Sequence, residues 1–348
     1  MESLHRRGGE PCPHETLQRR SEINPVEAAA HDPLVDVAAR ELLEAPSLSL
    51  VRPAPERRRT AAERAWILLR AVRPRQWSKN LLVLAAPAAA GALDHSSVAG
   101  QALAAFVVLC MVSSATYLVN DVRDREQDRL HPRKRKRPVA AGELAPAAAL
   151  RYAAVLATGG IALGTIVTPG LGLVAVGYLA LTASYSLWWR RVVVLDILAI
   201  AAGFVLRAIA GGVATDIYLS RWFVLVTAFC AIYLVAAKRL AELRDHTGAG
   251  PVRATLRRYS IGSLGLTLGA SATAAGVAYT SWAFTRPAHV VWYALSIVPL
   301  LLWLVRYAML IGAGAGQAPE ELILRDRALL ALTVAWGLLF LGGVYVGH

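Results

Sequence analysis

The sequence predicts an all-α polytopic membrane protein, a bundle of nine transmembrane helices with its active site on the cytoplasmic side. Of the 348 residues, 56% are hydrophobic and the mean hydropathy is +0.45, which is too apolar for one soluble domain of this length. Apolar segments recur along the chain with basic loops between them. The 3 cysteines are too scattered to indicate a disulfide framework.

Residues 1–64 come before the apolar part of the chain. They are rich in Pro, Glu, Arg and Ala, show little periodicity, and predict a largely disordered N-terminal tail with no cleavable signal peptide. The transmembrane domain is expected over residues 65–348. The net charge is +13, and the tail is nearly neutral, so the basic excess lies in the membrane domain. It favours an anionic substrate or anionic lipid, although orientation signals explain much of it.

Nine membrane spans follow from the apolar runs. We estimate them as Leu81–Leu93, Leu103–Val119, Ala147–Val167, Leu171–Trp189, Val192–Val213, Trp222–Ala237, Leu264–Phe284, Val291–Leu310 and Ala328–Val346. The first is short and contains Pro87, so we expect it to be tilted or broken, or to begin nearer Trp66.

The distribution of Lys and Arg predicts the orientation. Basic residues fall in alternate loops, which places loops 120–146, 238–262 and 311–327 in the cytoplasm. The outer side receives only Arg221 and Arg286. We therefore expect a multi-pass protein of the cell inner (plasma) membrane, with its N-terminus in the cytoplasm and its C-terminus outside. Nucleic acid is not an expected partner, because the basic residues flank apolar spans without exposed aromatics between them.

The loop after the second span carries the clearest candidate for chemistry. Asp121, Asp124 and Asp128 are spaced i, i+3 and i+7, so a helix places the three carboxylates on one face, and Asn120 shares a face with the last two. Crowded carboxylates repel one another unless a cation lies among them, and Mg²⁺ takes oxygen ligands together with phosphates. The predicted magnesium ligands are therefore Asn120, Asp121, Asp124 and Asp128.

Five consecutive basic residues, Arg133 to Arg137, follow these carboxylates. A carboxylate cluster for metal beside a cation cluster for phosphate is what diphosphate chemistry requires. We therefore take Lys134 and Arg137 as candidate substrate-binding residues. The alternative is a solvated basic loop that only fixes the topology, but that alternative leaves the spaced carboxylates unexplained.

Two more candidate groups lie on the same side of the membrane. Lys238 and Glu242 are four residues apart on a helix, next to Arg239, and are either functional groups or a surface ion pair. Lys79 and Asn80 begin the first span, where backbone N–H groups favour an anion. The alternative for Lys79 is snorkelling toward the lipid headgroups.

Arg207 lies inside an apolar stretch. A cation within a membrane is costly and usually faces a cavity or a partner, so Arg207 is also a candidate substrate-binding residue. Asp196 lies in the same span on a similar helical face, and the sequence leaves open whether the two side chains meet.

With these motifs in view, the chain resembles the UbiA superfamily of intramembrane prenyltransferases. Their hallmark, Asn-Asp-x-x-Asp-x-x-x-Asp, is carried by Asn120, Asp121, Asp124 and Asp128. Four longer stretches resemble the branch of this superfamily that transfers phosphoribosyl groups to polyprenyl phosphate: Arg73-Pro74-x-Gln76-Trp77-x-Lys79-Asn80, Asn120 to Pro138, Arg207 to Gly212, and Lys238-Arg239-x-x-Glu242-Leu243. The resemblance covers residues 66–346.

One departure from the wider superfamily matters for the chemistry. Ordinary members carry a second Asp-rich motif where this chain has Lys238, Arg239 and Glu242, and a cation there suits a phosphate better than a second Mg²⁺. The resemblance therefore implies a Mg²⁺-dependent transfer of 5-phosphoribosyl from phosphoribosyl diphosphate to decaprenyl or another polyprenyl phosphate, an early step toward arabinan cell-wall precursors. The implied catalytic residues are Asp121, Asp124, Asp128, Lys238 and Glu242.

Two other functions remain as alternatives. One is a conventional member of the superfamily that uses a prenyl diphosphate donor and an aromatic acceptor. The other is a transporter of anionic solutes, although transporters usually place charges at the midplane of the membrane. The sequence also leaves a homo-oligomer open.

Overall fold

The structure is a computed structural model that describes residues 60–244, 256–285, 290–314 and 319–346. The predicted tail lies outside the described residues as far as residue 59, as do parts of the 238–262 and 311–327 loops. In the unit from Thr60 to His348, the described residues form helices and no strands, which confirms the predicted all-α class.

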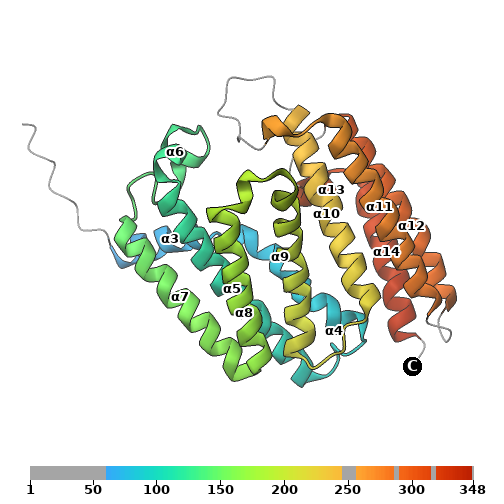
Figure 1. Ribbon diagram of the computed structural model, residues 1–348. Helices are drawn as coiled ribbons and strands as arrows, with labels where there is room; N and C mark the ends of the chain where they lie inside the picture. Colours follow the sequence, from blue (N-terminus) through green and yellow to red (C-terminus); the bar gives the residue numbers. More distant parts are fainter. Residues whose placement is uncertain (1–59, 245–255, 286–289, 315–318, 347–348) are drawn as a thin grey trace, which may run out of the picture. The chain divides into compact units, whose positions relative to one another are not determined.

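Within the residues that the structure describes, eight helices are long and apolar enough to cross a membrane. Each contains most of one predicted span, from the second span to the ninth. They are α5 (Ser96–Arg123), α7 (Pro146–Val167), α8 (Pro169–Leu187), α9 (Val193–Ala214), α10 (Arg221–Arg244), α11 (Ile261–Phe284), α12 (Val290–Gly312) and α14 (Arg327–Tyr345). Figure 1 shows α7, α5, α8, α9 and α10 following one another across the bundle, with α11, α12 and α14 at its other side.

The first predicted span, Leu81–Leu93, is broken. The chain instead forms α3 (Ala61–Val72), the 3₁₀ helix η2 (Pro74–Leu84) and the short α4 (Ala85–Ala89). Arg73 adopts a left-handed conformation with φ of 56°, and Pro74 follows it, so α3 cannot continue. The expected break is therefore present, and it begins before Pro87.

The remaining described elements are short and lie in the connections. They are α6 (Arg125–Leu130), η3 (Lys134–Lys136), η4 (Trp189–Arg191), η5 (Leu256–Arg258) and α13 (Pro319–Arg325).

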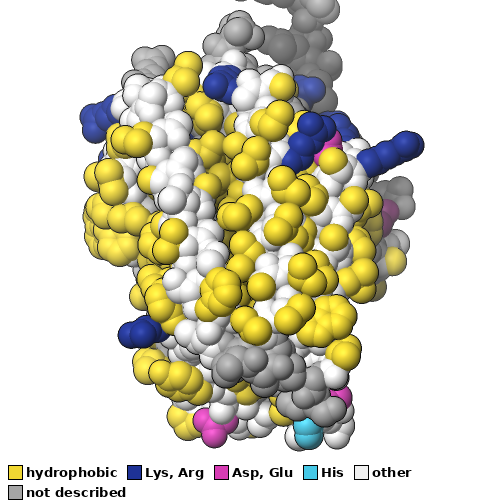
Figure 2. Space-filling model, turned by 90° about the vertical axis from the view of Figure 1, so that its right-hand side faces the viewer, with side chains coloured by type: hydrophobic (Ala, Val, Ile, Leu, Met, Phe, Trp, Pro, Cys, Tyr) yellow, Lys and Arg dark blue, Asp and Glu magenta, His cyan; other side chains and the backbone are white. Residues whose placement is uncertain are grey.

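The surface of the bundle is suited to lipid. Four side chains on α12 are each more than half exposed: Val291, Leu295, Val298 and Val305. Exposing apolar side chains in this way is unfavourable in water but not among lipid acyl chains. Figure 2 shows hydrophobic side chains over the middle of one face and Lys and Arg gathered near its upper end. This distribution agrees with the predicted membrane protein.

Gly211 on α9 permits close contact with η2. A Cβ at this position would overlap the carbonyl oxygen of Val83 and lie 2.8 Å from its carbonyl carbon. Gly211→Ala is therefore expected to destabilise the protein by about 1–3 kcal/mol, because backbone must move to admit the methyl group. Thermal unfolding in detergent measures this effect. Gly177→Ala, where a Cβ meets nothing within 4 Å, is the matched control, and an equal loss in both variants would contradict the explanation.

Candidate active site at the end of α5

The three aspartates lie where α5 gives way to α6. Asp121 is in the last turn of α5, Asp124 caps its C-terminus, and Asp128 is on α6. The helical hydrogen bonds from Asp124 N to Asn120 O and from Asp128 N to Asp124 O are both 2.9 Å. The predicted spacing is therefore kept across the break between the two helices. Asp121 and Asp128 are buried, whereas the Asp124 side chain is 26% exposed.

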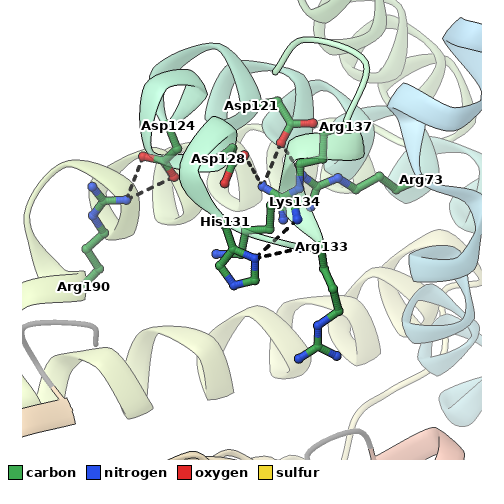
Figure 3. Close-up of polar contacts among 9 residues, drawn as sticks. All are labelled: Arg73, Asp121, Asp124, Asp128, His131, Arg133, Lys134, Arg137 and Arg190. Atoms are coloured by element: carbon green, nitrogen blue, oxygen red, sulfur yellow. Dashed lines mark hydrogen bonds and ion pairs between the residues drawn. The ribbon is translucent and has the colours of Figure 1, made fainter. Parts of the chain in front are cut away.

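Arginines connect these carboxylates to distant parts of the chain (Figure 3). Arg137 Nη1 lies 2.5 Å from Asp128 Oδ2 and 3.2 Å from Asp121 Oδ1. Arg73 also donates to Asp121 Oδ1. Asp124 points the other way and pairs with Arg190 on η4, at 3.3 Å. The three predicted carboxylates therefore point in two directions. Asp121 and Asp128 point toward Arg137, and Asp124 points toward Arg190.

The basic loop has a defined turn at its start. His131 Nδ1 accepts hydrogen bonds from the backbone N–H of Arg133 at 3.2 Å and of Lys134 at 3.4 Å. Desolvation, followed by the charges of Lys134 and Arg133, lowers the pKa of His131, which favours the neutral imidazole that can accept at Nδ1. The turn leads into η3 and positions Arg137 against the aspartates. Lys134 is half-buried beside it.

Arg73 is the less exposed partner of the pair around Asp121. The Arg73 side chain is 25% exposed, against 28% for Arg137. A guanidinium keeps its proton in proteins. Arg73 therefore places a positive charge against Asp121.

The described residues have no group of three or more His, Cys, Asp or Glu side chains arranged to hold a metal ion. One oxygen is nevertheless suited to a cation, because Asp121 Oδ2 is buried and accepts no hydrogen bond. A buried carboxylate oxygen without a partner is costly unless something binds it. This oxygen and the carboxylates of Asp124 and Asp128 fit the oxygen preference of Mg²⁺.

The predicted group on α10 is organised around Arg239, which is buried. Arg239 bonds Asp196 on α9 through Nε at 2.7 Å and Nη2 at 3.0 Å, and Glu242 through Nη1 at 2.7 Å. Tyr185 donates to the same aspartate at 2.8 Å. Lys238 is exposed. Glu242 is therefore oriented by Arg239.

Asn80 and Arg207 form a second buried polar network. Arg207 donates to Asn80 Oδ1 at 2.9 Å, to the Gly203 carbonyl at 2.8 Å and to the Tyr178 hydroxyl at 2.6 Å. Asn80 does not lie at a helix start, because η2 begins at Pro74, and its side chain is buried within the network. Arg207 and Asp196 have separate partners and do not pair. The structure therefore gives Asn80 and Arg207 structural contacts.

Lys79 has a different setting. Its ammonium donates to Gln76 at 2.7 Å, and the residue lines an apolar cavity of 830 Å³ between η2, α4, α10, α11, α12 and α14. Aromatic side chains make up much of the wall: Phe204, Trp222, Tyr279, Trp282, Trp303, Trp336 and Phe340. Among the described lining residues, Lys79 is the only one with a formal charge.

The sequence did not identify Arg73, Arg190 and Asp196 as site residues. Arg73 stands in a quoted motif, Arg190 is one of the basic loop residues without a separate signal, and the sequence leaves open whether Asp196 pairs with Arg207. Their contacts join residues 43 to 66 positions apart in the chain, and the helical spacing that located the aspartates does not predict such pairs.

Known proteins share this sequence pattern and this fold. Residues 81–330 match the UbiA prenyltransferase family. The decaprenyl-phosphate phosphoribosyltransferase of Mycolicibacterium smegmatis is 43% identical over 285 residues, covering 77% of this chain and 89% of that protein. The protein of the same name from Corynebacterium glutamicum is 42% identical, covering 80% and 87%. A UbiA homolog from Archaeoglobus fulgidus, solved with GPP and Mg²⁺, has a TM-score of 0.60 at 17% identity and covers 80% of this chain and 99% of that one.

Proposed function

The chain belongs to the UbiA prenyltransferase family, and we propose that it transfers the 5-phosphoribosyl group of phosphoribosyl diphosphate to a polyprenyl phosphate and releases diphosphate. The similarity to phosphoribosyltransferases of that name over more than three quarters of the chain carries this proposal. Decaprenyl phosphate is the acceptor that the relatives' name supports, and the lipid product would then serve cell-wall arabinan synthesis.

The donor site is the cluster of aspartates and cations after α5. Asn120, Asp121, Asp124 and Asp128 would hold Mg²⁺, which offsets negative charge on the diphosphate as it leaves. Lys134 and Arg137 would bind the phosphates of the donor. Arg137 pairs with Asp121 and Asp128, and Lys134 lies beside it, which supports this role.

The acceptor site is the apolar cavity beside Lys79. A polyprenyl tail is apolar and matches the aromatic wall, and the Lys79 ammonium is suited to the phosphate at the head of the lipid. An acceptor phosphate oxygen then attacks C1 of the ribose as the bond from C1 to the diphosphate oxygen breaks. That phosphate is already anionic near neutral pH, so the reaction needs no general base.

The group on α10 has two roles in this proposal. Lys238 is exposed and remains a candidate for a phosphate. Arg239 donates to Glu242 directly and is itself held by Asp196, so Arg239 is a positioning residue, and Glu242 would bind a ribose hydroxyl.

The proposed topology has nine crossings. The segment α3–η2–α4 would cross first, in addition to the eight long helices. The end of α5 then faces the cytoplasm, where the soluble donor is found, and the C-terminus lies outside. The excess of Lys and Arg in loops on that side supports this orientation.

Lys79→Met tests the acceptor site. We expect KM for the polyprenyl phosphate to rise about tenfold, because the lipid phosphate loses a charge-assisted contact, while KM for the sugar diphosphate stays unchanged. Steady-state rates at varied lipid concentration measure this. Arg75→Met removes an exposed cation from the same 3₁₀ helix as a control. A rise in donor KM alone would contradict the assignment of Lys79.

The reaction itself is tested by offering alternative donors. Purified protein with Mg²⁺ receives ribose-labelled phosphoribosyl diphosphate and decaprenyl phosphate, or geranylgeranyl diphosphate and 4-hydroxybenzoate. We expect labelled lipid from the first pair and no product from the second. Product from the second pair alone would identify a conventional prenyltransferase. Uptake of an anion into liposomes without turnover would identify a transporter.

A further inference from the structure

Each carboxylate of the aspartate cluster is bound by a guanidinium. Asp121 pairs with Arg73 and Arg137, Asp128 pairs with Arg137 and Asp124 pairs with Arg190. These arginines come from three separate parts of the chain: the junction of α3 and η2, the loop after η3, and η4. The aspartate cluster is therefore held by ion pairs that connect it to the rest of the bundle.

These ion pairs weaken the binding of a metal ion that arrives without an accompanying anion. Three carboxylates face three guanidinium groups, so a divalent cation gains no net attraction from the cluster. Arg137 donates to both Asp121 and Asp128, and its charge would repel a cation bound between them. A metal can bind the paired oxygens of Asp124 and Asp128 only if their arginine contacts weaken or move.

The arginines suit a second anion that arrives with the metal. A guanidinium binds phosphate oxygens in the same fork geometry that it uses for carboxylates. Arg190 and Arg137 are each about 30% exposed, with side-chain values of 30% and 28%, so they can reach a soluble ligand. Asp121 Oδ2, which has no hydrogen-bond partner, can accept a cation before any arginine moves.

We propose that Arg137 and Arg190, which pair with Asp128 and Asp124 in the structure, exchange partners when Mg²⁺ and the sugar diphosphate bind together. The carboxylates of Asp124 and Asp128 then bind the metal, and the two arginines bind phosphate oxygens of the donor. Arg190 thereby becomes a donor-binding residue supplied by the turn between α8 and α9. This inference rests on the proposed function for the identity of the donor, but the exchange itself requires only a metal and a diphosphate.

Two properties follow from the exchange. Metal binding without diphosphate should be weak, because each metal contact costs an ion pair. Diphosphate should strengthen metal binding, because it gives the displaced arginines a new partner, and the coupling must be equal in both directions.

Mn²⁺ binding tests the exchange without any turnover. The protein in phosphatidylcholine nanodiscs is dialysed against Mn²⁺ with and without inorganic diphosphate, with empty nanodiscs in parallel, and electron paramagnetic resonance counts the free ion. We expect diphosphate to strengthen Mn²⁺ binding by the wild-type protein. In Arg190→Gln, binding without diphosphate should become about tenfold tighter, because Asp124 is freed, and the gain from diphosphate should shrink.

Arg137→Gln is a second variant, in which Mn²⁺ binding without diphosphate should also become tighter. It keeps the test decisive if Arg190→Gln does not fold. Arg306→Gln is the matched control, since Arg306 pairs with Asp326 at 2.7 Å away from the cluster. Gel filtration and thermal unfolding verify that each variant is folded. Mn²⁺ binding without diphosphate that is unchanged or weaker in both cluster variants would overturn the exchange.

The outcomes separate this inference from the proposed function. If the protein makes labelled lipid but the variants bind Mn²⁺ like wild type, the arginines are structural and only the exchange is wrong. If the variants behave as expected but no phosphoribosyl lipid forms, the exchange stands and the proposed reaction is wrong.

Discussion

Replacing Asp124 with asparagine is expected to reduce phosphoribosyl transfer by about 10²–10³-fold, because the site loses one of the charges that stabilise the leaving diphosphate. Asp124 is the most suitable of the three aspartates for this test. It is partly exposed and pairs with Arg190 at the surface of the site, whereas Asp121 and Asp128 are buried. The change should therefore reduce activity without unfolding the protein.

Initial rates of labelled lipid formation at saturating lipid measure the effect, and thermal unfolding verifies the fold. Glu126→Gln is the matched control, because Glu126 is on α6 beside Asp124 in sequence, its side chain is 73% exposed and its partners are Arg125 and Arg129. The control should keep its activity. If Asp124→Asn also keeps most of its activity, the aspartate cluster does not serve the reaction.

Replacing Asp196 with alanine is expected to destabilise the protein by about 3–5 kcal/mol, since it leaves the buried Arg239 without its principal partner. Both side chains are almost fully buried, at 1% and 4% exposure. Asp196 accepts two bonds from Arg239 and one from Tyr185, and so joins α8, α9 and α10. Glu242 remains, but it is bound to a single nitrogen of the guanidinium.

Unfolding in detergent, followed by tryptophan fluorescence, measures this loss. Glu143→Ala removes the partner of Arg70 from a pair whose side chains are 30% and 34% exposed, and should cost no more than about 1 kcal/mol. Combining Asp196→Leu with Arg239→Met should recover part of the stability, because the buried guanidinium is removed together with its partner and only Glu242, whose side chain is 17% exposed, loses a contact. Equal small losses in Asp196→Ala and Glu143→Ala would show that the buried network contributes little.

Much of the fold could be predicted from the sequence because membrane spans depend on local composition. Eight spans were located from apolar runs, and each matches a long helix. The first was harder, because the left-handed conformation of Arg73 and the proline after it separate α3 from η2, and the short α4 follows η2. Its exact path depends on packing against α5 and α9, which hydropathy does not report.

The sequence predicted those parts of the site whose residues lie close together along the chain. The aspartate spacing and the basic run identified one cluster, and Arg137 indeed lies within it. The contacts of Arg190, Arg207 and Asp196 join different helices, so they follow from the tertiary fold. Asn80 illustrates the difference: it was predicted at a helix start, but the helix begins six residues earlier, at Pro74, and the amide instead holds Arg207 in the interior.

The fate of the donor's phosphates tests the central claim most directly. Phosphoribosyl diphosphate is labelled either on its 5-phosphate or on its diphosphate, and each form is incubated with the protein, Mg²⁺ and decaprenyl phosphate. The account predicts that the 5-phosphate label enters the lipid and that the diphosphate label is released as inorganic diphosphate in equal amount. Diphosphate label in the lipid, or release of diphosphate without any labelled lipid, would contradict it.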